Sequence, residues 1–147
     1  MTPRGQIIDR PVPGKTWLAK PDEMNPQIAR WRKDFPDIVR VDEEKQFSGD
    51  SVYAITVTAN NDKPKKNFMV AVPHAHEPAG TAAAMNFLNE VITGTKLNGS
   101  ATTLGREEIL EKVRLTFIPL ANPFGRKNRP WTGGMGVPIP TKSSELS

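Results

Sequence analysis

The sequence VAVPHAHEPAG, at residues 70–80, combines a short apolar run with three side chains that can bind a metal ion. The apolar run has the length and the β-branched content of a buried strand, and the proline that follows it cannot extend a hydrogen-bonded ladder. Pro78 suits the first turn of a helix, because it has no amide hydrogen to lose there. We therefore expect His74, His76 and Glu77 to lie where a strand passes into a helix. Open α/β folds usually bind ligands at this carboxyl edge of the sheet.

His74 and Glu77 form an H-x-x-E pair, which offers an imidazole nitrogen and a carboxylate oxygen. Both are common zinc ligands. On a tight turn two residues three apart can converge on one point, whereas on a regular strand they would face opposite sides of the sheet. A second interpretation is equally open from these residues alone. In it the histidines are polar loop residues, and Glu77 only favours the positive amino end of the helix.

The composition fits a single globular domain. The chain has 147 residues, of which 37% are hydrophobic and 24% are charged, and its net charge is +4. The densest basic cluster, KPKK at residues 63–66, has no aromatic residues among it, which favours a solvated loop over a nucleic-acid site. No apolar run reaches the length of about 18 residues that a membrane span needs. We expect neither a nucleic-acid nor a membrane partner, and the sequence indicates no oligomeric state.

The chain contains no cysteine, so it has no disulfide and no thiolate metal site. A metal ion would therefore be held by His, Asp, Glu or water, and the two histidines of the chain are His74 and His76. The amino terminus lacks the apolar core of a signal peptide. On these grounds we expect the protein to be cytoplasmic.

The sequence pattern divides the chain into three parts. Residues 1–20, rich in proline and glycine, predict an extended arm, residues 21–131 carry the predicted helices and strands, and residues 132–147 predict a disordered tail. The elements predicted in the central part are helices at 26–35, 78–92 and 106–113, strands at 38–46, 52–58, 67–72 and 114–120, and a turn at 121–125. Their order predicts an α/β fold with a mixed β-sheet flanked by helices, in which an antiparallel hairpin joins parallel crossovers.

Four segments carry a pattern that is recognisable as a whole. They are MNPQIARWRKDFPDIVRV at 24–41, SVYAITVT at 51–58, VPHAHEPAG at 72–80 and IPLANPFG at 118–125. In this order they resemble the amino-terminal half of the zinc carboxypeptidases, over residues 24–129. The resemblance implies a zinc-carboxypeptidase-like fold, truncated as given, and His74 and Glu77 as two ligands of Zn²⁺. It also implies that the full protein removes carboxy-terminal residues from peptides.

Other residues that the resemblance implies have no counterpart in this chain. The family's third zinc ligand is a histidine well downstream of the Asn-Pro turn, and no histidine follows His76 here. Its general base is a later glutamate and its substrate-binding tyrosine also comes late, whereas this chain has Glu145 in the tail and Tyr53 on an early strand. Phe124 replaces the acid of the family's Asn-Pro-Asp-Gly step. We therefore assign no catalytic residue, and we expect an amino-terminal fragment with two of three zinc ligands to be inactive alone.

The family also uses arginines after the Asn-Pro turn to bind substrate, and Arg126 and Arg129 are the expected counterparts here, at a compressed spacing. Two alternatives stay open beside a carboxypeptidase. One is a degenerate domain of the same fold that acts as a binding module. The other is a related zinc deacylase, which uses H-x-x-E at the same place. The expected substrate is accordingly a peptide or a small acylated amino acid.

Overall fold

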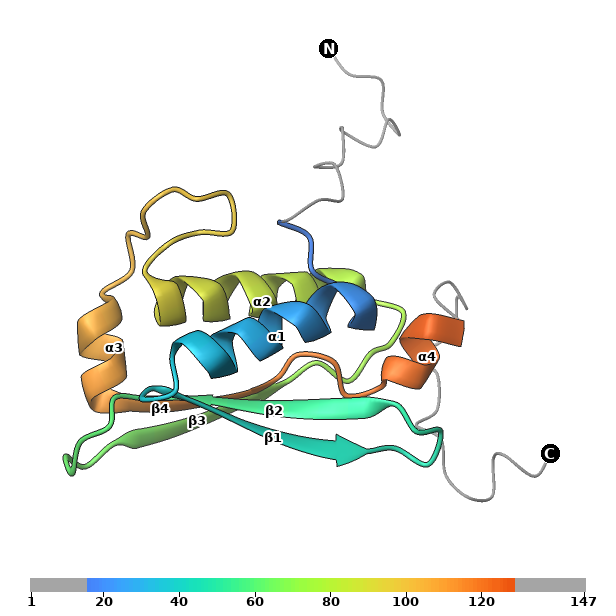
Figure 1. The fold of residues 1–147 in the computed structure, drawn as a ribbon, viewed down its shortest axis with the longest axis horizontal. Helices are drawn as coiled ribbons and strands as arrows, with labels where there is room; N and C mark the ends of the chain where they lie inside the picture. The colour runs from blue at the N-terminus through green and yellow to red at the C-terminus, as the bar shows by residue number, and fades with distance from the viewer. Residues whose placement is uncertain (1–15, 129–147) are drawn as a thin grey trace, which may run out of the picture.

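A four-stranded mixed sheet forms the base of the structure, and two long helices lie across one of its faces (Figure 1). The computed structural model describes residues 16–128, so most of the predicted arm and all of the predicted tail lie outside it. The strands are β1 (Val39–Lys45), β2 (Ser51–Val57), β3 (Lys66–Ala71) and β4 (Val113–Ile118). The helices are α1 (Pro21–Asp34), α2 (Pro78–Thr93), α3 (Arg106–Lys112) and α4 (Pro123–Asn128). Among these described helices, none is long and apolar enough to cross a membrane.

The strand pairing confirms the predicted mixed sheet, whose spatial order is β1-β2-β4-β3. β1 and β2 form an antiparallel hairpin, β2 also pairs antiparallel with β4, and β4 pairs in parallel with β3. The crossover from β3 to β4 passes through α2 and α3. Because β3 and β4 run in the same direction, their carboxyl ends meet at one edge, where Ala71 is paired with Ile118. The chain leaves this edge into α2 from one strand and into α4 from the other.

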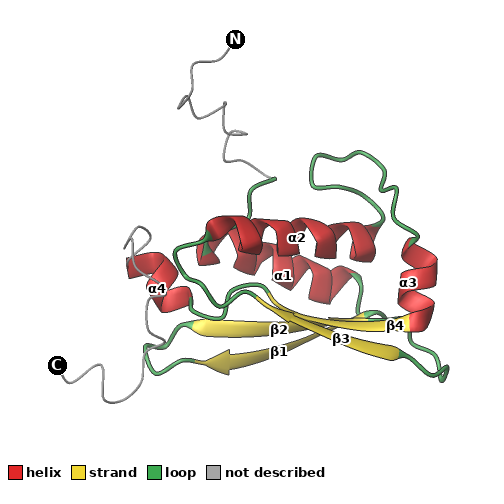
Figure 2. Ribbon diagram, turned by 180° about the vertical axis from the view of Figure 1, so that it is seen from behind, coloured by secondary structure: helices red, strands yellow, loops and turns green. Residues whose placement is uncertain are grey.

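The core lies between the sheet and helices α1 and α2, which Figure 2 shows from behind. Apolar residues spaced three, four or seven apart give each helix one buried face. These residues are Met24, Ile28 and Trp31 on α1 and Met85, Leu88, Val91 and Ile92 on α2. Trp31 Nε1 donates a hydrogen bond to Asn89 Oδ1 at 3.1 Å, so both buried polar groups have a partner. The packing fixes the position of α2, and with it the place where α2 begins.

Helix α1 begins earlier than the sequence predicts, at Pro21 instead of residue 26. The carboxylate of Glu23 accepts hydrogen bonds from the backbone amides of Ala19 and Lys20, at 3.2 and 3.1 Å, and so stabilises the first turn. Pro26 consequently lies inside the helix, and its missing amide costs one hydrogen bond near the amino end.

The turn predicted at residues 121–125 is instead the beginning of α4. Asn122 Oδ1 accepts a hydrogen bond from Gly125 N at 2.9 Å, which is the contact an N-cap residue makes with the third residue of a helix. Pro123 takes the first helical position, where a proline is well tolerated. An Asn-Pro step is typical of turns and of helix starts alike, and here it starts a helix.

The apolar run before the histidines predicts a buried strand, and this prediction is wrong. Every residue of β3 is exposed, with Phe68, Met69 and Val70 at 54%, 72% and 42%. β3 lies at the edge of the sheet, where within residues 16–128 it pairs with β4 alone. An apolar sequence is typical of a strand with both faces covered, and the described part of the chain does not cover β3.

Candidate metal centre

Residues 73–77, which we call the H-x-x-E turn, join β3 to α2 at the carboxyl edge of the sheet. Val72 still bonds to β4, with its amide 3.0 Å from the carbonyl oxygen of Ile118. Pro73 begins the turn and Pro78 follows it as the first residue of α2, and neither has an amide hydrogen to donate. Among the described residues, the backbone of this turn makes one hydrogen bond to itself, from Glu77 N to His74 O at 3.3 Å. The turn therefore depends on contacts from other segments for its conformation.

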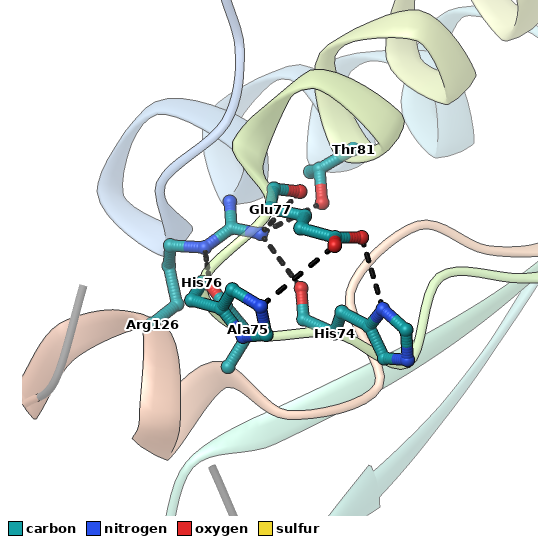
Figure 3. A network of polar contacts seen from close by, with 6 residues as sticks. All are labelled: His74, Ala75, His76, Glu77, Thr81 and Arg126. Atoms are coloured by element: carbon teal, nitrogen blue, oxygen red, sulfur yellow. Dashed lines mark hydrogen bonds and ion pairs between the residues drawn. The ribbon is translucent and has the colours of Figure 1, made fainter. Parts of the chain in front are cut away.

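The carboxylate of Glu77 lies between two imidazoles (Figure 3). His74 Nδ1 is 2.9 Å from Glu77 Oε2, and His76 Nε2 is 3.7 Å from Glu77 Oε1. The two imidazole rings stack, with their centroids 5.8 Å apart and an angle of 11° between their planes. The turn thus brings together the side chains of His74 and Glu77, which the sequence predicts to converge although they are three residues apart.

The pair of His74 and Glu77 faces solvent, with side chains 46% and 60% exposed. The hydrogen bond with His74 holds the pKa of the Glu77 carboxyl below its usual value, and the charges of both imidazoles act in the same direction. Glu77 is therefore an anion at neutral pH. His76 is more enclosed, and its Nδ1 is buried without a hydrogen-bond partner among the described residues.

The donor chemistry of His74 and Glu77 fits zinc, since imidazole nitrogen and ionised carboxylate oxygen are both normal ligands of this ion. Their donor atoms already lie 2.9 Å apart on an open side of the turn. A catalytic zinc takes three protein ligands and leaves one position for water. Within residues 16–128, no group of three His, Cys, Asp or Glu side chains is placed to hold a metal ion. The described residues therefore bring together two side chains with suitable donor atoms, His74 and Glu77.

Arg126, which the sequence analysis expects to bind substrate, lies beneath the H-x-x-E turn and is 5% exposed. Its guanidinium donates hydrogen bonds to the backbone oxygens of Ala19, His74, Ala75 and Glu77 and to the hydroxyl of Thr81. These contacts engage all three nitrogen atoms of the side chain, and Figure 3 shows those of Nε and Nη2. Substrate binding by Arg126 stays a prediction. Arg129 lies outside the described residues, so its contact with substrate also stays a prediction.

Sequence reasoning missed the contact between Arg126 and the H-x-x-E turn, because 51 residues separate the arginine from Ala75. A signal for it was present in the predicted topology. Both segments follow strands that were expected to run in parallel, and parallel neighbours end at the same edge of a sheet. What the pattern could not give is the direction of the arginine side chain, which α4 sets.

Comparisons with known proteins identify a family and a shared fold. A family model described as zinc carboxypeptidase matches residues 24–131. A search of curated protein sequences found no significant match. Among solved structures, the fold is similar to that of thrombin-activatable fibrinolysis inhibitor, with a TM-score of 0.67 and 15% identity over 79% of this chain and 29% of that chain.

Two further structures are similar to a comparable degree. The carboxypeptidase A of Helicoverpa armigera has a TM-score of 0.63 and 19% identity, over 83% of this chain and 28% of that chain. A metallo-carboxypeptidase of Burkholderia cenocepacia has a TM-score of 0.63 and 15% identity, over 74% of this chain and 28% of that chain. At these identities the solved structures show a shared fold. The chain spans less than a third of the length of each.

Proposed function

Since the chain belongs to the zinc carboxypeptidase family, we propose that it contributes one part of the active site of a zinc-dependent hydrolase that removes carboxy-terminal residues from peptides. In this proposal His74 and Glu77 supply two of the zinc ligands. The observation that carries it is the contact of 2.9 Å between His74 Nδ1 and Glu77 Oε2 at the carboxyl edge of the sheet. A peptide substrate is favoured over an acylated amino acid because the matching family model describes carboxypeptidases.

The roles of the chain's own residues follow from their chemistry. Zinc, when bound, lowers the pKa of a coordinated water to about 7 and polarises a carbonyl group. Glu77 offers a negative charge at neutral pH, and the hydrogen bond with His74 lowers the pKa of its carboxyl further below the usual value. His74 offers an imidazole nitrogen on the same open side of the turn. A third ligand and a general base are both needed for hydrolysis, and we propose that they come from outside residues 16–128.

A zinc titration of the 147-residue chain tests the ligand assignment. We expect the chain to bind one zinc ion weakly. Calorimetry and the NMR signals of the histidine rings would measure this binding. His74→Ala and Glu77→Gln should each abolish it. The control is Glu108→Gln, which removes a similarly exposed carboxylate that pairs with Lys112 on α3. Binding that survives both ligand substitutions would overturn the assignment, and one tightly held ion would overturn the two-ligand count.

A binding module that has the fold without the chemistry is the second candidate function. The incomplete ligand set among the described residues favours it. The two candidate functions differ in whether a longer protein that contains this sequence needs His74 and Glu77 for peptidase activity. Peptidase activity that His74→Ala abolishes would support the hydrolase, and activity that survives the substitution would favour the binding module.

A further inference from the structure

Arg126 carries a buried positive charge that has no carboxylate partner in the described structure. None of the ion pairs within residues 16–128 involves it, although its residue is 5% exposed. Burial lowers the pKa of the guanidinium, but an arginine remains protonated in proteins. Buried charges need compensation, and here it comes from backbone carbonyl oxygens and one hydroxyl. An arrangement of this kind indicates that the cation organises the backbone around it.

Three of the four carbonyl groups that bond Arg126 belong to the H-x-x-E turn. They are those of His74, Ala75 and Glu77, with Nη2 at 3.5 Å from the first and 3.2 Å from the last, and Nε in contact with the second. Buried carbonyl groups without partners are costly, and this turn makes one hydrogen bond within its own backbone. Arg126 thus supplies side-chain donors to three carbonyl oxygens of the turn, of which that of His74 also accepts the bond from Glu77 N.

The guanidinium also connects the turn to the surrounding elements. Nη2 lies 3.3 Å from Thr81 Oγ1 in the first turns of α2, and Nη1 contacts the carbonyl oxygen of Ala19 just before α1. Its own position is set by α4, which Asn122 caps at the end of β4. The carbonyls of the turn point inward to one cation, while the side chains of His74 and Glu77 lie on the outer side (Figure 3).

We propose that Arg126 is a positioning residue for the metal centre, which holds the backbone of the H-x-x-E turn so that His74 and Glu77 face a common point. It acts from inside the turn, through carbonyl oxygens, and not through contact with the ion. The consequence for zinc affinity rests on the proposed function. The consequence for the order of the turn does not.

Lysine cannot replace this residue, because its donors sit on one nitrogen atom and cannot spread over carbonyls on different sides. Arg126→Lys therefore keeps the charge and most of the volume but removes the fork of donors. The matched control is Arg106→Lys. Arg106 is half-buried, and it also donates to two backbone carbonyls, those of Val91 and Ile92 at 2.8 Å each, at the opposite end of α2.

The test uses the 147-residue chain and measures ¹⁵N relaxation of the amides of residues 74–77 in both variants, with urea unfolding to establish that each is folded. In Arg126→Lys we expect order parameters in the turn to fall from about 0.85 to below about 0.6, and in Arg106→Lys to stay unchanged. With zinc chloride as the probe, Arg126→Lys should weaken binding about 10-fold or more, as is typical when a group that supports a ligand is lost.

The outcomes separate the two proposals. A turn that stays rigid in a folded Arg126→Lys variant, or that loosens equally in Arg106→Lys, would overturn the positioning role whatever zinc does. If the wild-type chain binds no zinc but the turn loosens only in Arg126→Lys, the positioning role stands and the ligand assignment fails. Arg126→Ala serves as a second variant, and it should give at least as large a loss of order at residues 74–77.

Discussion

Replacement of Asp50 by asparagine should lower the stability of the chain at neutral pH by about 1 kcal/mol. Asp50 lies in the turn of the β1–β2 hairpin, and its carboxylate contacts Lys127 Nζ on α4 at 2.6 Å and Ser48 Oγ at 2.9 Å. The Asp50 side chain is 14% exposed, but that of Lys127 is 52% exposed, so solvent weakens the ion pair. Asparagine keeps the shape and an acceptor for Ser48. The substitution therefore removes mainly the attraction between the hairpin and α4.

The effect of this substitution should depend on pH. Burial raises the pKa of Asp50, but the hydrogen bonds from Lys127 and Ser48 outweigh it, so the folded-state pKa lies below its usual value. A group with a depressed pKa contributes stability that is complete above its unfolded pKa, about 3.9, and that is lost as pH falls through the folded value. The difference between wild type and Asp50→Asn should thus be constant from about pH 5 to 8 and shrink as the pH falls below the unfolded pKa of about 3.9.

Urea unfolding followed by tryptophan fluorescence, at a series of pH values, measures this difference. The control is Asp42→Asn, because Asp42 also pairs with a cation, Arg40, at 2.7 Å, but both side chains are more than half exposed. Its loss should stay within a few tenths of a kcal/mol, as for other exposed pairs. A loss in Asp50→Asn that is as large at pH 2 as at pH 7 would refute the electrostatic reasoning.

Three other substitutions test the packing around the site. Asn122→Ala should cost about 1 kcal/mol or more in urea unfolding, since it removes the cap to Gly125 N at 2.9 Å, and an unchanged midpoint would contradict the capping role. Trp31→Phe should cost about 1–3 kcal/mol in urea unfolding followed by circular dichroism, because buried Asn89 loses its indole donor, and a smaller cost would mean that the contact is dispensable. Met69→Lys should suppress concentration-dependent association in sedimentation experiments, since an exposed apolar edge strand favours it, and a wild-type chain that stays monomeric would refute this.

The order of the elements and the mixed sheet could be predicted because they depend on local signals. Strand β2 is β-branched and aromatic, and helix α2 ends where the sequence places a glycine, with Gly94 at a φ of 77°. Four strands separated by clear turn and helix signals leave few topologies. The meeting of His74 and Glu77 on one turn also follows from a local spacing.

The features that the sequence did not predict depend on tertiary contacts. The composition of β3 indicates burial, but burial depends on what covers a strand, and that information is not in its own residues. The Asn-Pro step at 122–123 allows either a turn or a helix start, and packing at the end of β4 favours the helix. The contacts of Arg126 required the side-chain direction that α4 gives it. These three features all lie at or next to the edge of the sheet where the candidate metal centre lies.

Order and completeness are separate properties of this centre. The conformation of the H-x-x-E turn is set by described residues, since Arg126 supplies donors to three of its carbonyl groups. If His74 and Glu77 bind zinc as proposed, its affinity depends on a third ligand as well, which no cluster of described residues supplies. The exposed strand β3 directly precedes the turn, so its apolar surface and the exposed pair of His74 and Glu77 are neighbours. A rigid turn with weak zinc binding is therefore the state that this chain should show, and relaxation and titration measure the two properties independently.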